Sequence, residues 1–70
     1  MTKYKHHKGN IYEFLFIATH SETEEKLVIY RNSEGKIFAR PYDMFFEKII
    51  REGQEVPRFE KVDINIDKDL

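Results

Sequence analysis

The stretch KLVIYRNSEGKIFAR, residues 26–40, sets two apolar runs on either side of the turn signal NSEG. Asn32 suits the first position of a type I turn, and Gly35 suits the left-handed residue that closes a G1 bulge. We therefore predict a β-hairpin with a defined register, since a slip of one residue would exchange the two faces of both strands. The predicted pairs are Asn32 with Lys36, Arg31 with Ile37, Tyr30 with Phe38, Ile29 with Ala39, and Val28 with Arg40.

The stretch before this hairpin, IYEFLFIATH at residues 11–20, contains no Gly or Pro and is dense in β-branched and aromatic residues. It predicts a long strand. Both alternating sets of side chains are apolar in its middle, which predicts a central strand covered at least in part on both sides. The following segment HSETEE combines hydroxyl side chains that bond backbone amides with glutamates that favour water, so residues 20–25 predict a turn.

The stretch after the hairpin mixes helix and strand signals. Pro41 pushes Arg40 towards extended geometry and can begin a helical turn over residues 41–44. We predict a strand over residues 45–51, a hairpin loop in REGQEVP (51–57) and a last strand in RFEKV (58–62).

Short strands, tight turns and one helical turn together predict the fold class. We expect a mostly β protein, either a small, strongly bent sheet or an SH3-like barrel with one short helical turn. Residues 1–62 are predicted to form a single small β-barrel domain, and residues 63–70 a C-terminal extension or frayed tail.

The composition predicts a soluble, cytoplasmic domain. The chain has 70 residues, of which 40% are hydrophobic and 36% charged, which fits one small globular domain and not a disordered chain. It has no cysteine, which excludes disulfides and favours an intracellular location. No apolar run approaches the ~20 residues of a membrane span, so no membrane association is predicted. The net charge of -1 gives no general attraction to nucleic acid.

Four blocks of the sequence, taken in order, carry a resemblance to a known family. They are YKHHKGNIYEFL (4–15), ATHSETEEKLVIY (18–30), ARPYDMFFE (39–47) and VPRF (56–59). With them, the chain resembles a family of small bacterial proteins, the domain of unknown function 1653 family. It departs from the family pattern at Phe38, where the family usually carries Trp, and in its shorter hairpin. The resemblance implies a fold and a set of positions, and no reaction.

The histidines are the first candidates for chemistry. The three histidines and Glu22 could ligate zinc, but their spacing fits no standard pattern, and His6 and His7 are expected on opposite faces of a strand. His20 and the adjacent Ser21 diverge in extended geometry and cannot form a nucleophile–base pair. We therefore predict no catalytic residue, no metal site and no cofactor. The alternative is a small hydrolase or metal-assisted enzyme that uses His6 and His20.

Two groups combine basic and aromatic side chains. Aromatic rings beside Lys or Arg can stack on nucleic-acid bases or bind a peptide, while the cations hold phosphates. Tyr30 and Phe38 can also be core residues, because small barrels need bulky side chains. The first group is Tyr4, Lys5, His6, Lys8 and Tyr12, and the second is Tyr30, Phe38 and Arg40.

We predict a non-enzymatic binding module that recognises an anionic ligand, nucleic acid or a protein partner. In this hypothesis Lys8 and Arg40 hold the anionic group, and His20 and Tyr30 orient it by hydrogen bonds. A homodimer through open edge strands is a further alternative. The predicted ligand-binding residues are His6, Lys8, His20, Ser21, Tyr30 and Arg40.

Overall fold

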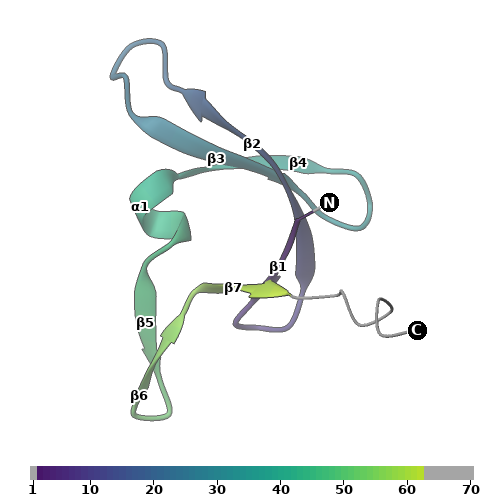
Figure 1. Cartoon of the computed structure of the whole chain (residues 1–70), viewed down its shortest axis with the longest axis vertical. Helices are drawn as coiled ribbons and strands as arrows, with labels where there is room; N and C mark the ends of the chain where they lie inside the picture. The colour runs from purple at the N-terminus through teal and green to yellow at the C-terminus, as the bar shows by residue number, and fades with distance from the viewer. Residues whose placement is uncertain (1, 63–70) are drawn as a thin grey trace, which may run out of the picture.

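The structure is a computed structural model, and it describes residues 2–62. These residues form seven strands and one short helix in two antiparallel sheets, which confirms the mostly β class (Figure 1). One sheet has five strands in the order β4-β3-β2-β1-β7, and the other pairs β5 with β6. The elements are β1 (Lys3–His6), β2 (Ile11–Thr19), β3 (Lys26–Arg31), β4 (Ile37–Pro41), α1 (Tyr42–Phe45), β5 (Lys48–Arg51), β6 (Gln54–Pro57) and β7 (Phe59–Val62).

The hairpin of β3 and β4 has the predicted register. Tyr30 lies opposite Phe38, and every other predicted strand pair is also present. Gly35 has a φ of +87°, the left-handed conformation that the turn requires. The Asn32 Oδ1 accepts hydrogen bonds from the backbone N–H groups of Glu34 and Lys36, both at 2.9 Å. The register is therefore fixed by local turn chemistry.

Strand β2 contains a β-bulge that explains its unusual pattern. Phe14 pairs with Tyr30 and Phe16 pairs with Ile29, so Leu15 is an extra residue between them. Because of this extra residue, Phe14 and Phe16 point to opposite faces of the sheet, whereas residues two apart in a regular strand share a face. Strand β2 is the middle strand of the five-stranded sheet, as predicted, and its two faces are covered only in part, since Phe16 is 57% and Ile17 45% exposed.

The hydrophobic core lies on one side of the five-stranded sheet. Its buried residues are Val28, Tyr30, Phe45 and Phe59, and the rings of Phe45 and Phe59 stack with their centroids 4.1 Å apart. Phe45 comes from α1 and Phe59 begins β7, so these two elements close the inner face of the hairpin. Four half-buried aromatic residues surround this core: Tyr4, Tyr12, Phe14 and Phe38.

The segment after β4 differs from the prediction in its boundaries. The helix covers residues 42–45 and not 41–44, and the next strand begins at Lys48 because Phe45 belongs to the helix. The predicted loop at residues 51–57 is a tight turn followed by β6. Glu52 and Gly53 have φ values of +54° and +81°, as in the two-residue turns that join antiparallel strands. The predicted tail at residues 63–70 lies outside the described residues.

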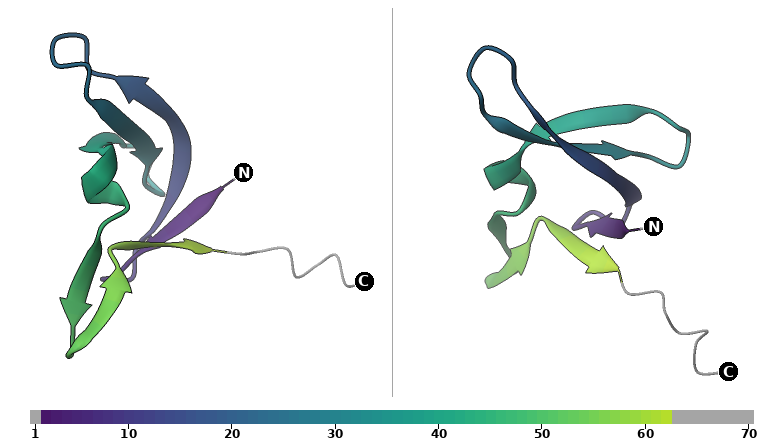
Figure 2. Two further views of the ribbon diagram at one scale, coloured as in Figure 1. Left: turned by 60° about the vertical axis from the view of Figure 1, so that its left-hand side comes forward. Right: turned by 45° about the horizontal axis from the view of Figure 1, so that its top comes forward.

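The five-stranded sheet is strongly bent, and β7 runs beneath β2 and β3 (Figures 1 and 2). The strands of residues 2–62 form two separate sheets and no closed barrel, so the SH3-like barrel stays a prediction. Within the same residues, no helix is long and apolar enough to cross a membrane.

Candidate functional site

The end of β1 meets β7 and β4 around the ring of Phe59. His6 lies opposite Phe59 in the sheet, and their rings are 4.9 Å apart in an edge-to-face arrangement. The guanidinium of Arg40 lies 5.4 Å from the centroid of the same ring. Its Nε donates a hydrogen bond of 3.2 Å to the Tyr30 hydroxyl. We call the cluster of His6, Lys8, Tyr30, Arg40 and Phe59 the basic–aromatic site.

Tyr12 and Phe38 connect the two predicted basic and aromatic groups. The Tyr12 ring contacts the rings of Phe59 and Phe38 edge-on, with centroid distances of 5.8 and 6.1 Å. Phe38 in turn stacks on Tyr30 at 5.5 Å. The two groups are therefore parts of one cluster. Tyr30 is only 4% exposed, so its ring is a core side chain and only its hydroxyl takes part in the site, through Arg40.

The turn after β1 places a second histidine beside the first. The rings of His6 and His7 lie 4.3 Å apart, so the prediction that they point to opposite faces is wrong. The physical reason is that the strand ends at His6 and the chain turns at His7. The Nδ1 of His6 accepts a hydrogen bond of 3.2 Å from the backbone N–H of Lys8. This bond orients the His6 ring and brings Lys8 to the same end of the molecule.

Two arginines that the sequence did not indicate complete the cationic surroundings. Arg51, from the end of β5, donates a hydrogen bond to the backbone carbonyl of His7. The backbone N–H of His7 in turn donates to the carbonyl of Arg58, at 2.9 Å. The Arg58 side chain pairs with Glu47. The sequence of residues 51–59 predicts a loop and the start of a strand, and no motif within it indicates a functional site.

Burial and the charges at this end of the molecule lower the pKa of both histidines. Partial burial lowers the pKa of His6 below its ordinary value, and His7, Arg40 and Lys8 lower it further. Partial burial and then Arg51, Lys8 and Arg58 lower the pKa of His7. Both shifts favour neutral imidazoles, and the charge contributions have the sign expected of a positive electrostatic potential. An anionic group entering the site would reduce that potential.

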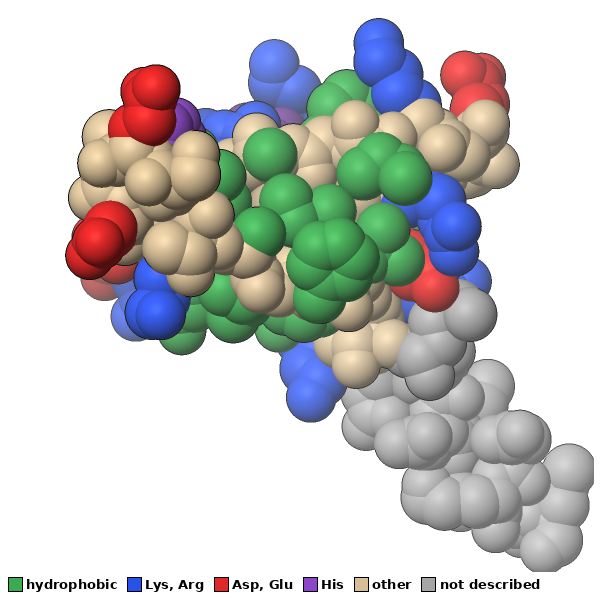
Figure 3. Space-filling view, turned by 90° about the horizontal axis from the view of Figure 1, so that it is seen from above, with side chains coloured by type: hydrophobic (Ala, Val, Ile, Leu, Met, Phe, Trp, Pro, Cys, Tyr) green, Lys and Arg blue, Asp and Glu red, His purple; other side chains and the backbone are tan. Residues whose placement is uncertain are grey.

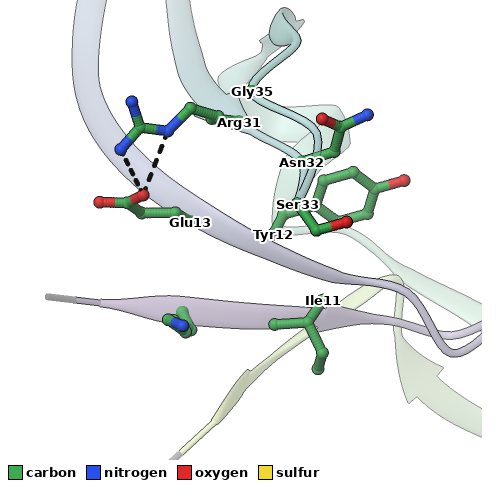
Figure 4. Close-up of a pocket in the computed structure, with 8 residues that line it drawn as sticks. Ile11, Tyr12, Glu13, Arg31, Asn32, Ser33 and Gly35 are labelled. Carbon is green, nitrogen blue, oxygen red and sulfur yellow. Dashed lines mark hydrogen bonds and ion pairs between the residues drawn. The ribbon is translucent and has the colours of Figure 1, made fainter.

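Two hollows flank the strands of this region. One has a volume of about 320 Å³ and opens beside the histidines; its lining is Lys5, His6, His7, Arg51, Val56, Pro57 and Glu60. The other, of about 380 Å³, lies between β1, β2 and the β3–β4 turn (Figure 4). In this hollow the Arg31 guanidinium forms an ion pair with the Glu13 carboxylate, with an N–O distance of 2.5 Å. Lys3 has no ion-pair partner among the described lining residues.

His20 and Ser21 are not part of the basic–aromatic site. They lie in the β2–β3 turn, at the opposite end of the nine-residue strand β2 from the β1–β2 turn, on the order of 25 Å away along the strand (Figure 1). The His20 Nδ1 accepts hydrogen bonds from the backbone N–H groups of Glu22 and Thr23, at 3.1 and 3.3 Å. His20 therefore stabilises its own turn.

This separation overturns the enzymatic alternative in the form that the sequence suggested. His6 and His20 do not converge on one pocket, and Ser21 lies equally far from His6. Among residues 2–62, no group of three or more His, Asp or Glu side chains is placed to hold a metal ion. Of the six predicted ligand-binding residues, four come together and two do not.

The fold and the site thus define a small, mostly β protein with a cationic, aromatic end. Over residues 2–61 the chain matches the family described as a protein of unknown function, DUF1653, and it belongs to this family. The match includes the whole basic–aromatic site. Neither the curated proteins nor the solved structures provide a match to the chain.

Proposed function

We propose that the protein is a non-enzymatic binding module whose basic–aromatic site holds a phosphate-bearing ligand, with single-stranded nucleic acid as the best fit. The observation that carries this proposal is the shared packing of His6 and Arg40 on the ring of Phe59. It places a fixed cation and a titratable imidazole side by side on one buried aromatic ring.

Arg40 is prepared to bind an anion. The Tyr30 hydroxyl accepts a hydrogen bond from the Arg40 Nε–H, and no hydrogen bond within residues 2–62 engages the two terminal nitrogens of Arg40. A guanidinium held against an aromatic ring loses little side-chain freedom when it binds, so its two remaining donor groups suit a phosphate oxygen pair. Lys8 is exposed and adds a second cation from the neighbouring turn.

The aromatic neighbours favour a nucleic acid over free phosphate. Tyr12 and Phe38 are half-buried rings that contact each other edge-on, and Tyr12 also contacts Phe59 of the site. The Lys36 Nζ lies over the Phe38 ring, 5.6 Å from its centroid, so a further cation lies next to this ring. Single-stranded nucleic acids bind such surfaces by stacking bases on rings and placing phosphates on Lys and Arg.

The proposal is tested by fluorescence anisotropy with a labelled eight-nucleotide single-stranded oligothymidylate and its RNA counterpart, between 50 and 200 mM salt. We expect binding that weakens steeply with salt, because phosphate contacts release counterions. Lys8→Gln and Arg51→Gln should each weaken binding about 3- to 10-fold and lower the salt slope by about one.

Lys26→Gln is the matched control, because Lys26 is an exposed cation at the start of β3, away from the site. It should leave the affinity unchanged, and thermal melting should confirm that all variants fold. The proposal is wrong if oligonucleotides fail to bind at 50 mM salt. It is equally wrong if Lys26→Gln weakens binding as much as Lys8→Gln does, because the attraction would then be unspecific.

A further inference from the structure

The outer face of β2, β3 and β4 carries two apolar rows and one row that also holds the Glu13–Arg31 ion pair. Strand register places three rows of side chains on it, since directly opposed residues of antiparallel strands share a face. The middle row of Phe16, Ile29 and Ala39 is entirely apolar. The apolar members of this outer face are Phe16, Ala18, Leu27, Ile29, Ile37, Ala39 and Pro41.

This outer face is open. Phe16 and Ile37 are 57% and 58% exposed, and both are large side chains in neighbouring parts of one surface. Figure 3 shows the face as an area of hydrophobic side chains on the side of the molecule opposite α1 and β7. Contiguous apolar surface of this kind on a small protein indicates an interaction site.

Charges of opposite sign lie at the two ends of the outer face. The β2–β3 turn at one end carries Glu22, Glu24 and Glu25, with Lys26 as its neighbouring cation. The other end carries more cations than carboxylates: Lys3, Arg31 and Lys36 against Glu13 and Glu34. In Figure 3 charged side chains of both signs border the hydrophobic area at each end, so the difference between the two ends is one of net charge.

We propose that the outer face binds the outer face of a second copy of this chain. A two-fold axis that crosses the strands over the middle row would stack the two sheets with their strands running in opposite directions. Phe16 would then meet its own counterpart. The acidic turn of each copy would lie over the cationic end of the other, so the charges make the surface complementary to itself.

The size of the outer face sets the expected strength. Three strands at ~4.8 Å spacing, each about six residues long at ~3.3 Å rise, give a flat footprint of roughly 280 Å². Stable dimers bury about 800 Å² per partner, so this footprint is well below the size of a standard interface. We therefore expect a weak, reversible dimer that forms at roughly 0.1–1 mM protein, and not an obligate one.

The test is sedimentation equilibrium of the full chain at concentrations from about 10 μM to 1 mM, a range that spans weak dimers. We expect the average mass to rise with concentration towards twice that of the monomer. Ile37→Asp should weaken association at least 10-fold. Ile50→Asp is the matched control, because Ile50 is 72% exposed on β5, in the other sheet, and should leave association unchanged.

A charge exchange tests the orientation of the two copies. The double variants E22K/E25K and K3E/K36E should each associate less than the natural chain, because like charges would meet at both ends. An equal mixture of the two should regain association, since each end then faces its opposite. A chain that stays monomeric to 1 mM overturns the proposal. A dimer that Ile37→Asp leaves intact also overturns it and favours pairing of edge strands.

Discussion

The inner and outer faces of β2, β3 and β4 both carry apolar side chains, yet only the inner face holds fully buried ones. Val28 and Tyr30, on the inner face of β3, are 0% and 4% exposed. On the outer face, Phe16 and Ile37 each expose more than half of their side chains. The difference comes from elements that follow in the sequence, because α1 and β7 supply Phe45 and Phe59 to one side only. The apolar pattern of a strand therefore does not reveal which of its faces forms the core.

The largest effect is expected from a change that moves the inner-face side chains of β3 to the outer face. Deleting Ile29 from β3 removes one residue from a regular strand, so the side chains on one side of the deletion reverse direction. We expect a loss of cooperative folding, since the reversal moves a core residue such as Val28 outwards. Circular dichroism and urea unfolding measure the effect.

A deletion at the bulge is the matched control. Removing Leu15 joins Phe14 and Phe16 into a regular alternation that keeps each residue on its present face. We expect a cost below about 2 kcal/mol and a cooperative unfolding transition. If this deletion unfolds the protein as completely as the loss of Ile29, the bulge has a further structural role.

The second comparison removes one Phe ring from each face. Phe45→Ala takes away a fully buried ring that contacts Tyr4, Phe14, Tyr30 and Phe59, and should lower the free energy of unfolding by about 3–5 kcal/mol. Phe16→Ala should change it by less than about 1 kcal/mol at low protein concentration. Urea unfolding measures both values, and equal losses would contradict the assignment of the two faces.

The turn residue Gly35 tests what fixes the register between these faces. Its φ of +87° is strained for any residue with a Cβ, although the space around it is open. Gly35→Ala should therefore cost about 1–2 kcal/mol through the backbone alone. Gly35→Asn should recover part of this loss, because Asn tolerates the left-handed conformation. Ser33→Ala in the same turn should be nearly neutral, and a similar loss there would contradict the explanation.

The hairpin could be predicted from the sequence because its determinants are local. Asn32 and Gly35 fix the turn, and the turn fixes the register. The bulge at Leu15 has no such local signal, so the sequence did not show that Phe14 and Phe16 point to opposite faces of β2. Glu52 and Gly53 form a two-residue turn with an unusual first residue, which hid β6 within a predicted loop.

The basic–aromatic site could be predicted only in part. His6, Lys8 and Arg40 stand out in the sequence as basic residues near aromatic ones. The partners that bring them together, Phe59 and Arg51, lie in later segments, and only the tertiary fold reveals the contacts. His20 was predicted in the site because it lies at a strand end within a block of the family resemblance, whereas its hydrogen bonds belong to the turn.

The smallest expected effect concerns pH at the border of the covered face, where His6 packs on Phe59. The pKa of His6 is lowered in the folded chain, so the unfolded chain binds more protons between the folded and unfolded pKa values. The stability from neutral His6 is fully present above about pH 6.5, the ordinary value, and is lost as the pH falls through the lowered pKa. We expect urea midpoints of the natural chain to fall between pH 7.5 and 5.5, and those of His6→Gln to fall less. An equal decline in the variant would assign the pH dependence to other groups, such as His7, whose pKa is lowered in the same direction.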